Sequence, residues 1–331
     1  MIYIVRCSNN MVTDYYLDII KMIFENCDEI VMNYNTTVKK EDIVVTATIK
    51  DFVKTYIKGN HKIIYWMQGI EAEESFLKHR SYLRRSILNI LTKFVLKKAK
   101  AIFYVSEAMR NFEETKFQVN TRMKSMIMPC FNTTFDKNSV NTPEKYKKNI
   151  FAYVGSLSAW QCFDETVDFY KKVEEMIGEC EFRVFTPEQN RAKEILEKKE
   201  VKNFTVDFVA PDKLKEKLAP IKFGFILRDN ISVNNVSTPT KISSYLAAGV
   251  IPIFSDCILD FSEKAKLLKY IVEVKDIKKI PENLIEFCTN EIDIAVLSKE
   301  YNDFFDLYYN PRLYIDTSKN WALGILRNLH E

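Results

Sequence analysis

Residues 223–256 read Phe-Gly-Phe-Ile-Leu-Arg-Asp-Asn-Ile-Ser-Val-Asn-Asn-Val-Ser-Thr-Pro-Thr-Lys-Ile-Ser-Ser-Tyr-Leu-Ala-Ala-Gly-Val-Ile-Pro-Ile-Phe-Ser-Asp. Two short apolar runs lie near the ends of this stretch, at 223–227 and 250–254. Runs of this kind are typical of strands that are buried on both faces of a parallel sheet. The residues between them are enough for a loop and a helix. The stretch therefore predicts a β-α-β unit, from which doubly wound α/β sheets are built.

The helix between the two runs is marked at both ends. Thr238 is a preferred N-cap residue, Pro239 suits the first helical position, and Gly249 suits the position after the C-cap. Lys241 falls in the first turn, where a cation opposes the helix dipole, and Arg228 ends the preceding strand. An anion held at the helix start by backbone N–H groups and these cations would explain the placement. A solvated Lys on an ordinary β-α-β unit would give the same pattern.

Residues 239–242 (Pro-Thr-Lys-Ile) and 245–252 (Tyr-Leu-Ala-Ala-Gly-Val-Ile-Pro) resemble the donor-site segment of family-4 glycosyltransferases. Further segments that resemble this family, in the family's order, are 66–69, 105–109 and 153–157 with Trp160. These are retaining enzymes of bacterial polysaccharide and capsule assembly. The resemblance implies the GT-B fold, in which two doubly wound Rossmann-like domains face each other across a cleft. It also implies a hexosyl- or related transferase activity.

Composition limits the remaining classes. The chain has 331 residues, of which 47% are hydrophobic, so it is long enough for two domains with cores. A net charge of +3 does not favour a nucleic-acid partner. The 7 cysteines are scattered without zinc-site spacing. Because residues 1–5 are predicted to be an apolar strand, we expect no signal peptide. No apolar run approaches the roughly 18 residues of a membrane span. We expect a cytoplasmic protein without cofactor or metal.

Two domains are expected from the alternation of strands and helices. The polar segment 131–148 lacks periodicity and is predicted to be the linker. The first, acceptor-side domain is expected over 1–140 and the second, nucleotide-sugar domain over 149–314. Strands of the first domain are predicted at 1–6, 29–33, 43–47, 62–66, 101–105 and 125–129. In the family, a final helix crosses back onto the first domain, which implies that role for about 315–331.

Polar residues that follow strands of the first domain are the candidates for acceptor binding. In open α/β sheets, ligands bind beyond the carboxyl ends of the strands. In the family, the first domain generally holds the acceptor. The candidates are Asn9, Asn10, Gln68, Gly69, Glu71 and Glu73. If the enzyme were inverting rather than retaining, one of these carboxylates would be the natural base. Polar loop residues without a ligand would give the same pattern.

The donor candidates lie in the second domain. By the resemblance, Arg228 and Lys241 are the catalytic residues, because they neutralise the diphosphate leaving group of a nucleotide sugar without a metal. Gly155 and Ser156 allow the backbone to approach the ligand and supply N–H groups. The strand edges at 185–187 and 209–211 hold the base. The donor-binding candidates are Gly155, Ser156, Thr186, Pro187, Val209, Ala210, Pro239, Thr240 and Ser244.

The chain departs from the family at one motif. Most family-4 enzymes carry two glutamates eight positions apart, the second of which holds the donor's ribose. The matching positions here are Val236 and Ser244. The missing glutamates have two possible explanations. Either the protein uses a different donor from most of the family, or its site no longer catalyses transfer. Two alternatives to a glycosyltransferase follow. One is a non-catalytic GT-B subunit that binds glycan or a partner, and the other is a transferase that uses a CDP-linked polyol donor.

The segment 76–100 is basic and amphipathic. It carries eight cations (Lys78, Arg80, Arg84, Arg85, Lys93, Lys97, Lys98 and Lys100) among leucine, isoleucine, valine and phenylalanine side chains. Such helices lie on anionic membrane surfaces, and each well-placed cation contributes about 1 kcal/mol to binding. A solvated basic face above a core stripe would give the same pattern. Contact with the inner face of a membrane is therefore one of two interpretations of this segment.

Overall fold

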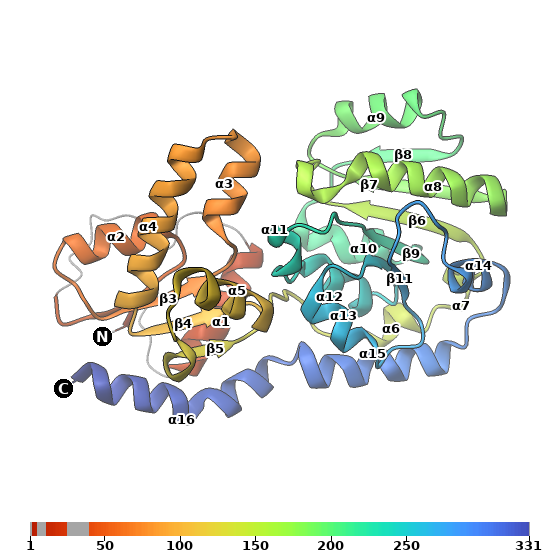
Figure 1. The fold of residues 1–331 in the computed structure, drawn as a ribbon. Helices are drawn as coiled ribbons and strands as arrows, with labels where there is room; N and C mark the ends of the chain where they lie inside the picture. The colour runs from red at the N-terminus through yellow and green to blue at the C-terminus, as the bar shows by residue number, and fades with distance from the viewer. Residues whose placement is uncertain (1, 5–10, 25–39, 331) are drawn as a thin grey trace. The chain divides into compact units, whose positions relative to one another are not determined.

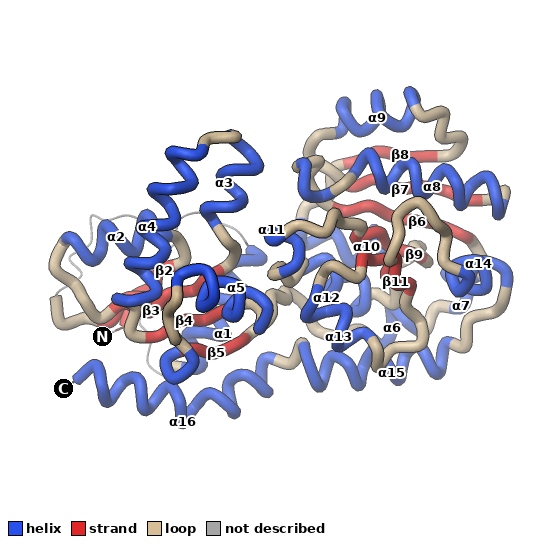
Figure 2. The backbone as a smooth tube through the Cα atoms, in the orientation of Figure 1, coloured by secondary structure: helices blue, strands red, loops and turns tan. Residues whose placement is uncertain are grey.

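The computed structural model describes residues 2–4, 11–24 and 40–330, and the chain forms two compact units (Figure 1). Unit 1 comprises residues 1–130, 235–238 and 310–331, and unit 2 comprises residues 131–234 and 239–309. Figure 2 distinguishes the helices and strands of the two units. The strand expected at 29–33 and the candidates Asn9 and Asn10 lie outside the described residues.

Unit 1 contains a parallel sheet in which the strands follow one another in chain order. The strands are β1 (Ile2–Ile4), β2 (Ile43–Thr46), β3 (Ile63–Met67), β4 (Ala101–Tyr104) and β5 (Ser125–Ile127). All residues of β2, β3 and β4 are buried. Continuous burial of this kind requires that helices cover both faces of the sheet.

The two faces of this sheet can be followed from neighbouring residues of β3. Tyr65 packs edge-on against Phe52 of α2 (Ile49–Ile57), with ring centroids 5.9 Å apart. Trp66 stacks on Tyr16 of α1 (Met11–Ile23) at 4.0 Å. Because successive side chains of a strand point to opposite faces, α1 and α2 cover opposite faces. The other helices of unit 1 are α3 (Glu71–His79), α4 (Tyr82–Lys98), α5 (Glu107–Phe117) and α16 (Pro311–His330), with the short η1 (Arg122–Lys124).

The C-terminal helix α16 belongs to unit 1. Its Trp321 lies 5.4 Å from the ring of Phe103 and 6.2 Å from the ring of Phe24. Phe103 pairs with Trp66 across β3 and β4, so α16 lies on the same face of the sheet as α1. Figure 1 shows α16 running along this unit beside α1, to which it is packed.

Unit 2 contains a parallel sheet of six strands in the order β11-β10-β9-β6-β7-β8. The strands are β6 (Asn149–Val154), β7 (Cys180–Phe185), β8 (Phe204–Asp207), β9 (Phe223–Ile226), β10 (Ile251–Ser255) and β11 (Val272–Val274). The chain runs outward from β6 to β8, returns to β9 beside β6, and continues to β11. The strand order thus reverses between β6 and β9. In doubly wound sheets, ligands bind at this switch point, beyond the carboxyl ends of the strands.

Helices cover both faces of this sheet as well. Tyr170 of α8 (Phe163–Ile177) stacks on Phe182 at 4.6 Å and lies 5.5 Å from Phe151, which points to the same face of the sheet as Phe182. On the other face, the ring of Tyr245 lies directly on Gly224, where a Cβ atom would be 2.5 Å away. The helices of unit 2 that follow β6 are α8 (Phe163–Ile177), α9 (Gln189–Lys198), α10 (Leu214–Leu218), α11 (Ser232–Asn235), α12 (Thr240–Ala247), α13 (Leu259–Ala265), α14 (Glu282–Thr289) and α15 (Ile294–Tyr308).

The segment 131–148 differs from the linker that the sequence predicts. It belongs to unit 2 and contains two short helices, α6 (Lys137–Val140) and α7 (Pro143–Tyr146). Phe131 and Val140 are fully buried, and the Tyr146 hydroxyl donates to the carbonyl of Gly249 at 2.9 Å. The apolar residues of this segment are few and irregularly spaced, so they produce no periodic pattern. Phe131, Val140 and Tyr146 are nevertheless buried in the core.

The ends of α12 also differ slightly from the sequence prediction. The N-cap is Pro239 and not Thr238, whose hydroxyl instead accepts a hydrogen bond from the backbone N–H of Cys130 at 3.0 Å. The C-terminal end is as predicted. Gly249 follows the C-cap Ala248 with φ of +69°, a left-handed conformation that favours glycine.

Candidate functional site

Four residues from separate elements meet at the switch point of the unit 2 sheet. Gly155 directly follows β6, and Arg228 comes two residues after β9. Lys241 lies in the first turn of α12. The fourth residue is Gln161, the last residue of the short helix η2 (Ala159–Gln161), which connects β6 to α8. Sequence analysis singled out the first three and missed Gln161.

The Gln161 carboxamide joins the two cations. Its Oε1 accepts hydrogen bonds from Lys241 Nζ at 2.7 Å and from Arg228 Nη2 at 2.8 Å. Arg228 Nη1 donates to the main-chain oxygens of Gln161 and Leu227, each at 2.9 Å. Lys241 Nζ also lies 5.1 Å from the centroid of the Tyr153 ring. The two positive charges therefore share one neutral acceptor.

The charge of this cluster has no carboxylate counterion within residues 40–330, since neither Arg228 nor Lys241 forms an ion pair there. Arg228 is only 7% exposed. Burial lowers the pKa of the Arg228 guanidinium. Burial and, second, the nearby charge of Arg228 hold the pKa of Lys241 well below its usual value. Two positive charges that lie close together and are shielded from water raise the free energy of the folded protein unless an anion compensates them. The cluster is therefore suited to binding an anion.

Gly155 leaves space for this cluster. Its φ is +132°, and a Cβ atom would lie 2.9 Å from Lys241 Nζ and 3.5 Å from Gln161 Oε1. Its N–H donates to the carbonyl of Phe185 at 2.9 Å. The expectation that this N–H contacts a ligand is therefore wrong, because it is already bonded within the sheet. The contribution of Gly155 is an open approach to the cations.

The remaining donor candidates lie around this centre. Ser156 Oγ is 3.0 Å from Ser158 Oγ and 3.5 Å from Gln161 Nε2. Thr186 is buried, and its hydroxyl accepts from the N–H of Glu188 at 3.2 Å. At the ends of β7 and β8, Pro187 and Ala210 are exposed and Val209 is half-buried.

In the middle of α12, the Ser244 hydroxyl lies 3.3 Å from the carbonyl of Thr240 and 3.4 Å from Asn132 Oδ1. The Ser243 hydroxyl also reaches Asn132 Oδ1, at 3.5 Å. Pro239 and Thr240 are partly exposed beside them. Asn132 was missed by sequence analysis because it lies in the segment interpreted as a linker. It brings a carboxamide to the position where the family resemblance implies a glutamate.

The acceptor candidates of unit 1 differ in their availability. Gln68 is exposed at the carboxyl end of β3, and a side chain at Gly69 would collide with the carboxylate of Glu74. Glu71 Oε1 accepts from the N–H of Ile49 at 2.9 Å and from the Tyr65 hydroxyl at 3.2 Å, and burial raises its pKa.

Glu73 has partners within unit 1. It pairs with Arg85 at 2.7 Å and with Lys116 at 2.6 Å. Burial raises the pKa of this carboxyl, but the hydrogen bonds and charges of Lys116 and Arg85 outweigh burial and hold it below its usual value. Glu73 thus links α3 to α4 and α5, and its carboxylate is occupied.

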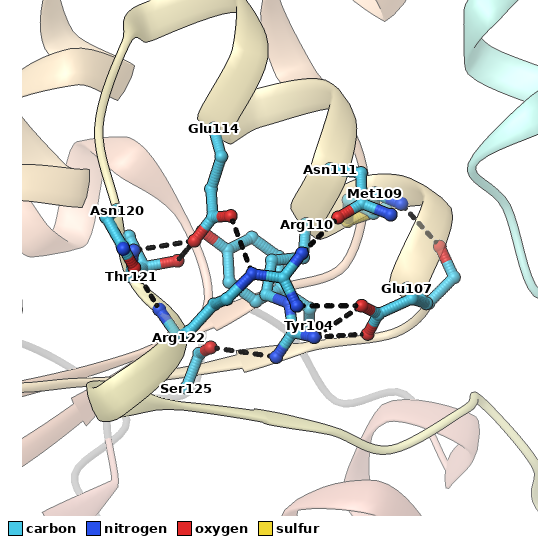
Figure 3. A network of polar contacts seen from close by, with 11 residues as sticks. Tyr104, Glu107, Met109, Arg110, Asn111, Glu114, Asn120, Thr121, Arg122 and Ser125 are labelled. Atoms are coloured by element: carbon cyan, nitrogen blue, oxygen red, sulfur yellow. Dashed lines mark hydrogen bonds and ion pairs between the residues drawn. The ribbon is translucent and has the colours of Figure 1, made fainter.

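Another first-domain segment that resembles the family, residues 105–109, supports the structure of α5. The Ser106 hydroxyl caps the helix by accepting from the N–H of Met109 at 2.9 Å. Glu107 binds Arg110 and lies 3.6 Å from Arg122, which lies at the same distance from Glu114 (Figure 3). These contacts stabilise the helix and the turn that follows it.

In the part of the chain that the structure describes, no helix is both long and apolar enough to cross a membrane. The described residues likewise contain no group of three or more His, Cys, Asp or Glu side chains placed to hold a metal ion.

No protein-family model matches the chain, and no curated protein matches it. Solved structures do match. Alr3699/HepE from Anabaena, in complex with UDP and glucose, is 11% identical with a TM-score of 0.69, over 98% of this chain and 99% of that chain. The α,α-trehalose-phosphate synthase (UDP-forming) from Burkholderia vietnamiensis is 10% identical with a TM-score of 0.61, over 88% of this chain and 72% of that chain.

A mutant of TarM from S. aureus, in complex with fondaparinux, α-GlcNAc-glycerol and UDP, is 11% identical with a TM-score of 0.65. The match covers 88% of this chain, which spans only 55% of the length of that protein. At such identities the likeness establishes the fold alone. The two parallel α/β sheets and these neighbours confirm the expected GT-B fold with two Rossmann-like domains.

Proposed function

We propose that the chain is a glycosyltransferase of the family-4 type. It would move a hexosyl or related sugar from a nucleotide-diphosphate donor to a glycan or lipid-linked glycan in cell-surface polysaccharide synthesis. The observation that supports this proposal is the pair of the buried Arg228 and the half-buried Lys241, which meet at the switch point and are joined through the neutral Gln161. A diphosphate is an anion with enough charge for two cations. UDP is present in the HepE and TarM complexes, whose fold the chain shares.

The chemistry follows from the change of charge during transfer. When the bond between the sugar and the diphosphate breaks, negative charge grows on the leaving group. Arg228 and Lys241 would bind this group more tightly in the transition state than in the ground state, which accelerates the reaction. In this proposal the two cations take the role that a divalent metal ion has in other transferases. Retention of configuration rests on the family resemblance.

The positions of the other donor candidates in the fold suggest which parts of the nucleotide sugar they would contact. The carboxyl ends of β7 and β8, with Thr186, Pro187, Val209 and Ala210, would hold the base. Ser244 and Asn132 would approach the ribose through hydroxyl and amide groups, because neither Val236 nor Ser244 supplies a carboxylate. For the acceptor, Gln68 and Glu71 are the groups of unit 1 that we propose, since Glu73 is bound to two cations.

Thermal melting with nucleoside diphosphates tests this function. One of UDP, GDP, CDP or ADP at a hundredfold excess over its Kd should stabilise the protein by about 2.7 kcal/mol, a shift of several degrees. A screen of donor hydrolysis with the matching nucleotide sugars would then identify the sugar. If no nucleotide shifts the melting temperature, the non-catalytic subunit is the correct alternative. Hydrolysis of a CDP-linked polyol, but of no nucleotide sugar, would favour the polyol transferase.

We also propose a peripheral location on the inner face of a membrane, through the hairpin of α3 and α4. The first half of α4 exposes large apolar side chains: Tyr82 at 72%, Leu83 at 73%, Ile87 at 49% and Ile90 at 70%. The exposed cations Arg84, Lys93 and Lys97 lie on the same helix. Exposed apolar residues beside cations match an anionic lipid surface, which accepts both. The alternative is a solvated basic face, on which binding to anionic vesicles would be absent or insensitive to salt.

A further inference from the structure

We infer that Gln161 is a positioning residue that holds Arg228 and Lys241 in place without cancelling their charge, and that its Oε1 occupies the position of a phosphate oxygen. This inference rests on the proposed function, because it concerns the same anion site. It assigns a role to a residue outside the motifs that the sequence indicates. It also explains why the residue is glutamine and not glutamate.

The contacts of Gln161 support the positioning role. One amide oxygen accepts from both Lys241 and Arg228, and the main-chain oxygen of the same residue accepts a third hydrogen bond from Arg228. These three bonds come from elements that are far apart in sequence. The cations would repel each other if no acceptor lay between them. Gln161 therefore brings the end of β9 and the start of α12 into one site.

The position of Gln161 is itself well defined. Its backbone N–H donates to the carbonyl of Ser158 at 2.8 Å, and its Nε2 faces the hydroxyl of Ser156 at 3.5 Å. The next residue, Cys162, has φ of +50° and is the N-cap of α8. The amide is thus oriented with its oxygen toward the cations. On the side of β6, Gly155 leaves the same point unobstructed.

The charge of the acceptor decides what the site can bind. A carboxylate at this position would form ion pairs with both cations and would stabilise the free protein, but it would repel a diphosphate. An amide satisfies the N–H donors and leaves both positive charges in place. A phosphate oxygen can accept from the same two donors with a stronger, charge-assisted bond. The amide oxygen can then yield its place by rotation of the side chain.

The variant Gln161→Glu separates charge from shape, because the two side chains have nearly the same volume. We expect its melting temperature to rise and its affinity for UDP, or for whichever diphosphate the wild type binds, to fall about tenfold to a hundredfold in calorimetric titration. Opposite changes in stability and affinity are the signature of the proposed role. If affinity and its salt dependence are unchanged, the anion binds elsewhere and Gln161 has only a structural role. Gln189→Glu, at the start of α9, is the control for the added charge.

The variant Gln161→Met provides a second measurement, should the first not fold. Methionine fills the space but accepts no strong hydrogen bond, so the variant removes the positioning contact without adding a negative charge. We expect a lower melting temperature and an affinity within about threefold of the wild type, since the phosphate replaces the lost acceptor. A loss of more than about a hundredfold would show that the amide itself binds the ligand, and would overturn the inference. So would wild-type affinity in Gln161→Glu. If the wild type binds no nucleoside diphosphate, the proposed function fails instead.

Discussion

Lys241 and Arg228 are the residues with the most direct consequences for activity. Both donate to Gln161 in the free protein, and burial disfavours the charged form of each. A bound diphosphate would stabilise the charged form of both side chains. The same arrangement that is unfavourable for folding is therefore favourable for the proposed reaction.

Lys241→Ala should lower turnover of the donor by about 10²–10³, which is the usual effect of losing one contact to a developing oxyanion. Arg228→Ala should lower turnover by a similar factor. The double variant should lose less than the product of the two, because both side chains serve one diphosphate. The melting temperature of Lys241→Ala should not fall, since the fold gains nothing from a buried charge. Lys193→Ala, an exposed lysine of α9, is the control, and wild-type turnover in Lys241→Ala would place the phosphate site elsewhere.

Glu113 of α5 presents the opposite case in unit 1. Its side chain is 2% exposed, and its Oε2 has no hydrogen-bond partner among the described residues. Burial raises its pKa from 4.5 to about 7. The protonated form is thus the one that the fold favours. The resulting contribution to the free energy of unfolding is present below pH 4.5 and is lost as the pH rises through about 7.

Glu113→Gln imitates the protonated carboxyl, so its stability should not show this loss. At pH 8 the variant should be more stable than the wild type by on the order of 2 kcal/mol, and at pH 4.5 the two should be nearly equal. Urea unfolding at several pH values measures the difference. Glu41→Gln removes an exposed carboxylate of the same unit and is the control. Equal stability of wild type and Glu113→Gln at pH 8 would show that the carboxylate is solvated.

The residues of the anion site were only partly predictable. Arg228 and Lys241 were found through the family resemblance, and a cation in a first helical turn, as at Lys241, also violates a local preference. Gln161 violates none, since a glutamine in a short loop after a strand is ordinary. Asn132 lies in a polar segment far from α12 in sequence. Both acquire a role only through contacts between distant segments, and no local pattern records such contacts.

At the scale of elements, the predicted and observed bounds of helices and strands agree best where an element is continuously buried. The sequence predicts a strand over 149–154 and a helix over 163–177, and β6 (Asn149–Val154) and α8 (Phe163–Ile177) have these bounds. An apolar run and a clear helical stripe leave few alternatives. Over 76–100 the sequence predicts either one long helix or a helix pair, and it does not decide between the two. The break comes at Arg80, with φ of +53°, followed by the N-cap Ser81. Neither glycine nor proline marks it.

A substitution at Gly249 tests the local structure at the C-terminal end of α12. A Cβ atom there would lie 2.7 Å from the Tyr146 hydroxyl and 3.0 Å from Val140 Cα. Gly249→Ala should therefore combine backbone strain with overpacking and lower the free energy of unfolding by about 2–4 kcal/mol. Gly324→Ala, in α16 with nothing within 4 Å, should instead raise it by up to about 1 kcal/mol. Destabilisation by the second variant, or none by the first, would contradict these local structures.

The hairpin of α3 and α4 makes a prediction about membranes. Replacing Arg84, Lys93 and Lys97 with Gln should weaken binding to vesicles that contain phosphatidylglycerol by about a hundredfold, at roughly 1 kcal/mol for each cation. Arg85 is left in place because it pairs with Glu73. Wild-type binding should fall steeply as salt rises to 0.15 M, where the screening length is about 8 Å. The control replaces the exposed Lys193, Lys198 and Lys266 of unit 2, and equal loss in that variant would mean that binding is unspecific.

At the scale of the whole molecule, the two units differ in how the chain builds them. Unit 2 is nearly continuous in sequence, whereas unit 1 needs residues 310–331 in addition to the first 130. α16 covers the face of the unit 1 sheet that carries Phe103, so this face is complete only when the end of the chain has folded. Contacts between distant segments slow folding, since the long loop must close before they form. The sequence indicated such a return only through the family resemblance.

Trp321→Ala tests whether the two units unfold separately. The indole packs on Phe103 and Phe24 but is only partly buried, so its loss should lower the stability of unit 1 by about 3 kcal/mol, the lower end for such substitutions. Amide hydrogen exchange should accelerate in α1 and β4 and stay unchanged in β6 and β9. A bound nucleoside diphosphate should have the complementary effect, with slower exchange in β6, β9 and α12. Leu323→Ala, 45% exposed on the same helix, is the control. Uniform acceleration across both sheets in Trp321→Ala would mean that the chain unfolds as one cooperative body, and that α16 stabilises unit 2 as much as unit 1.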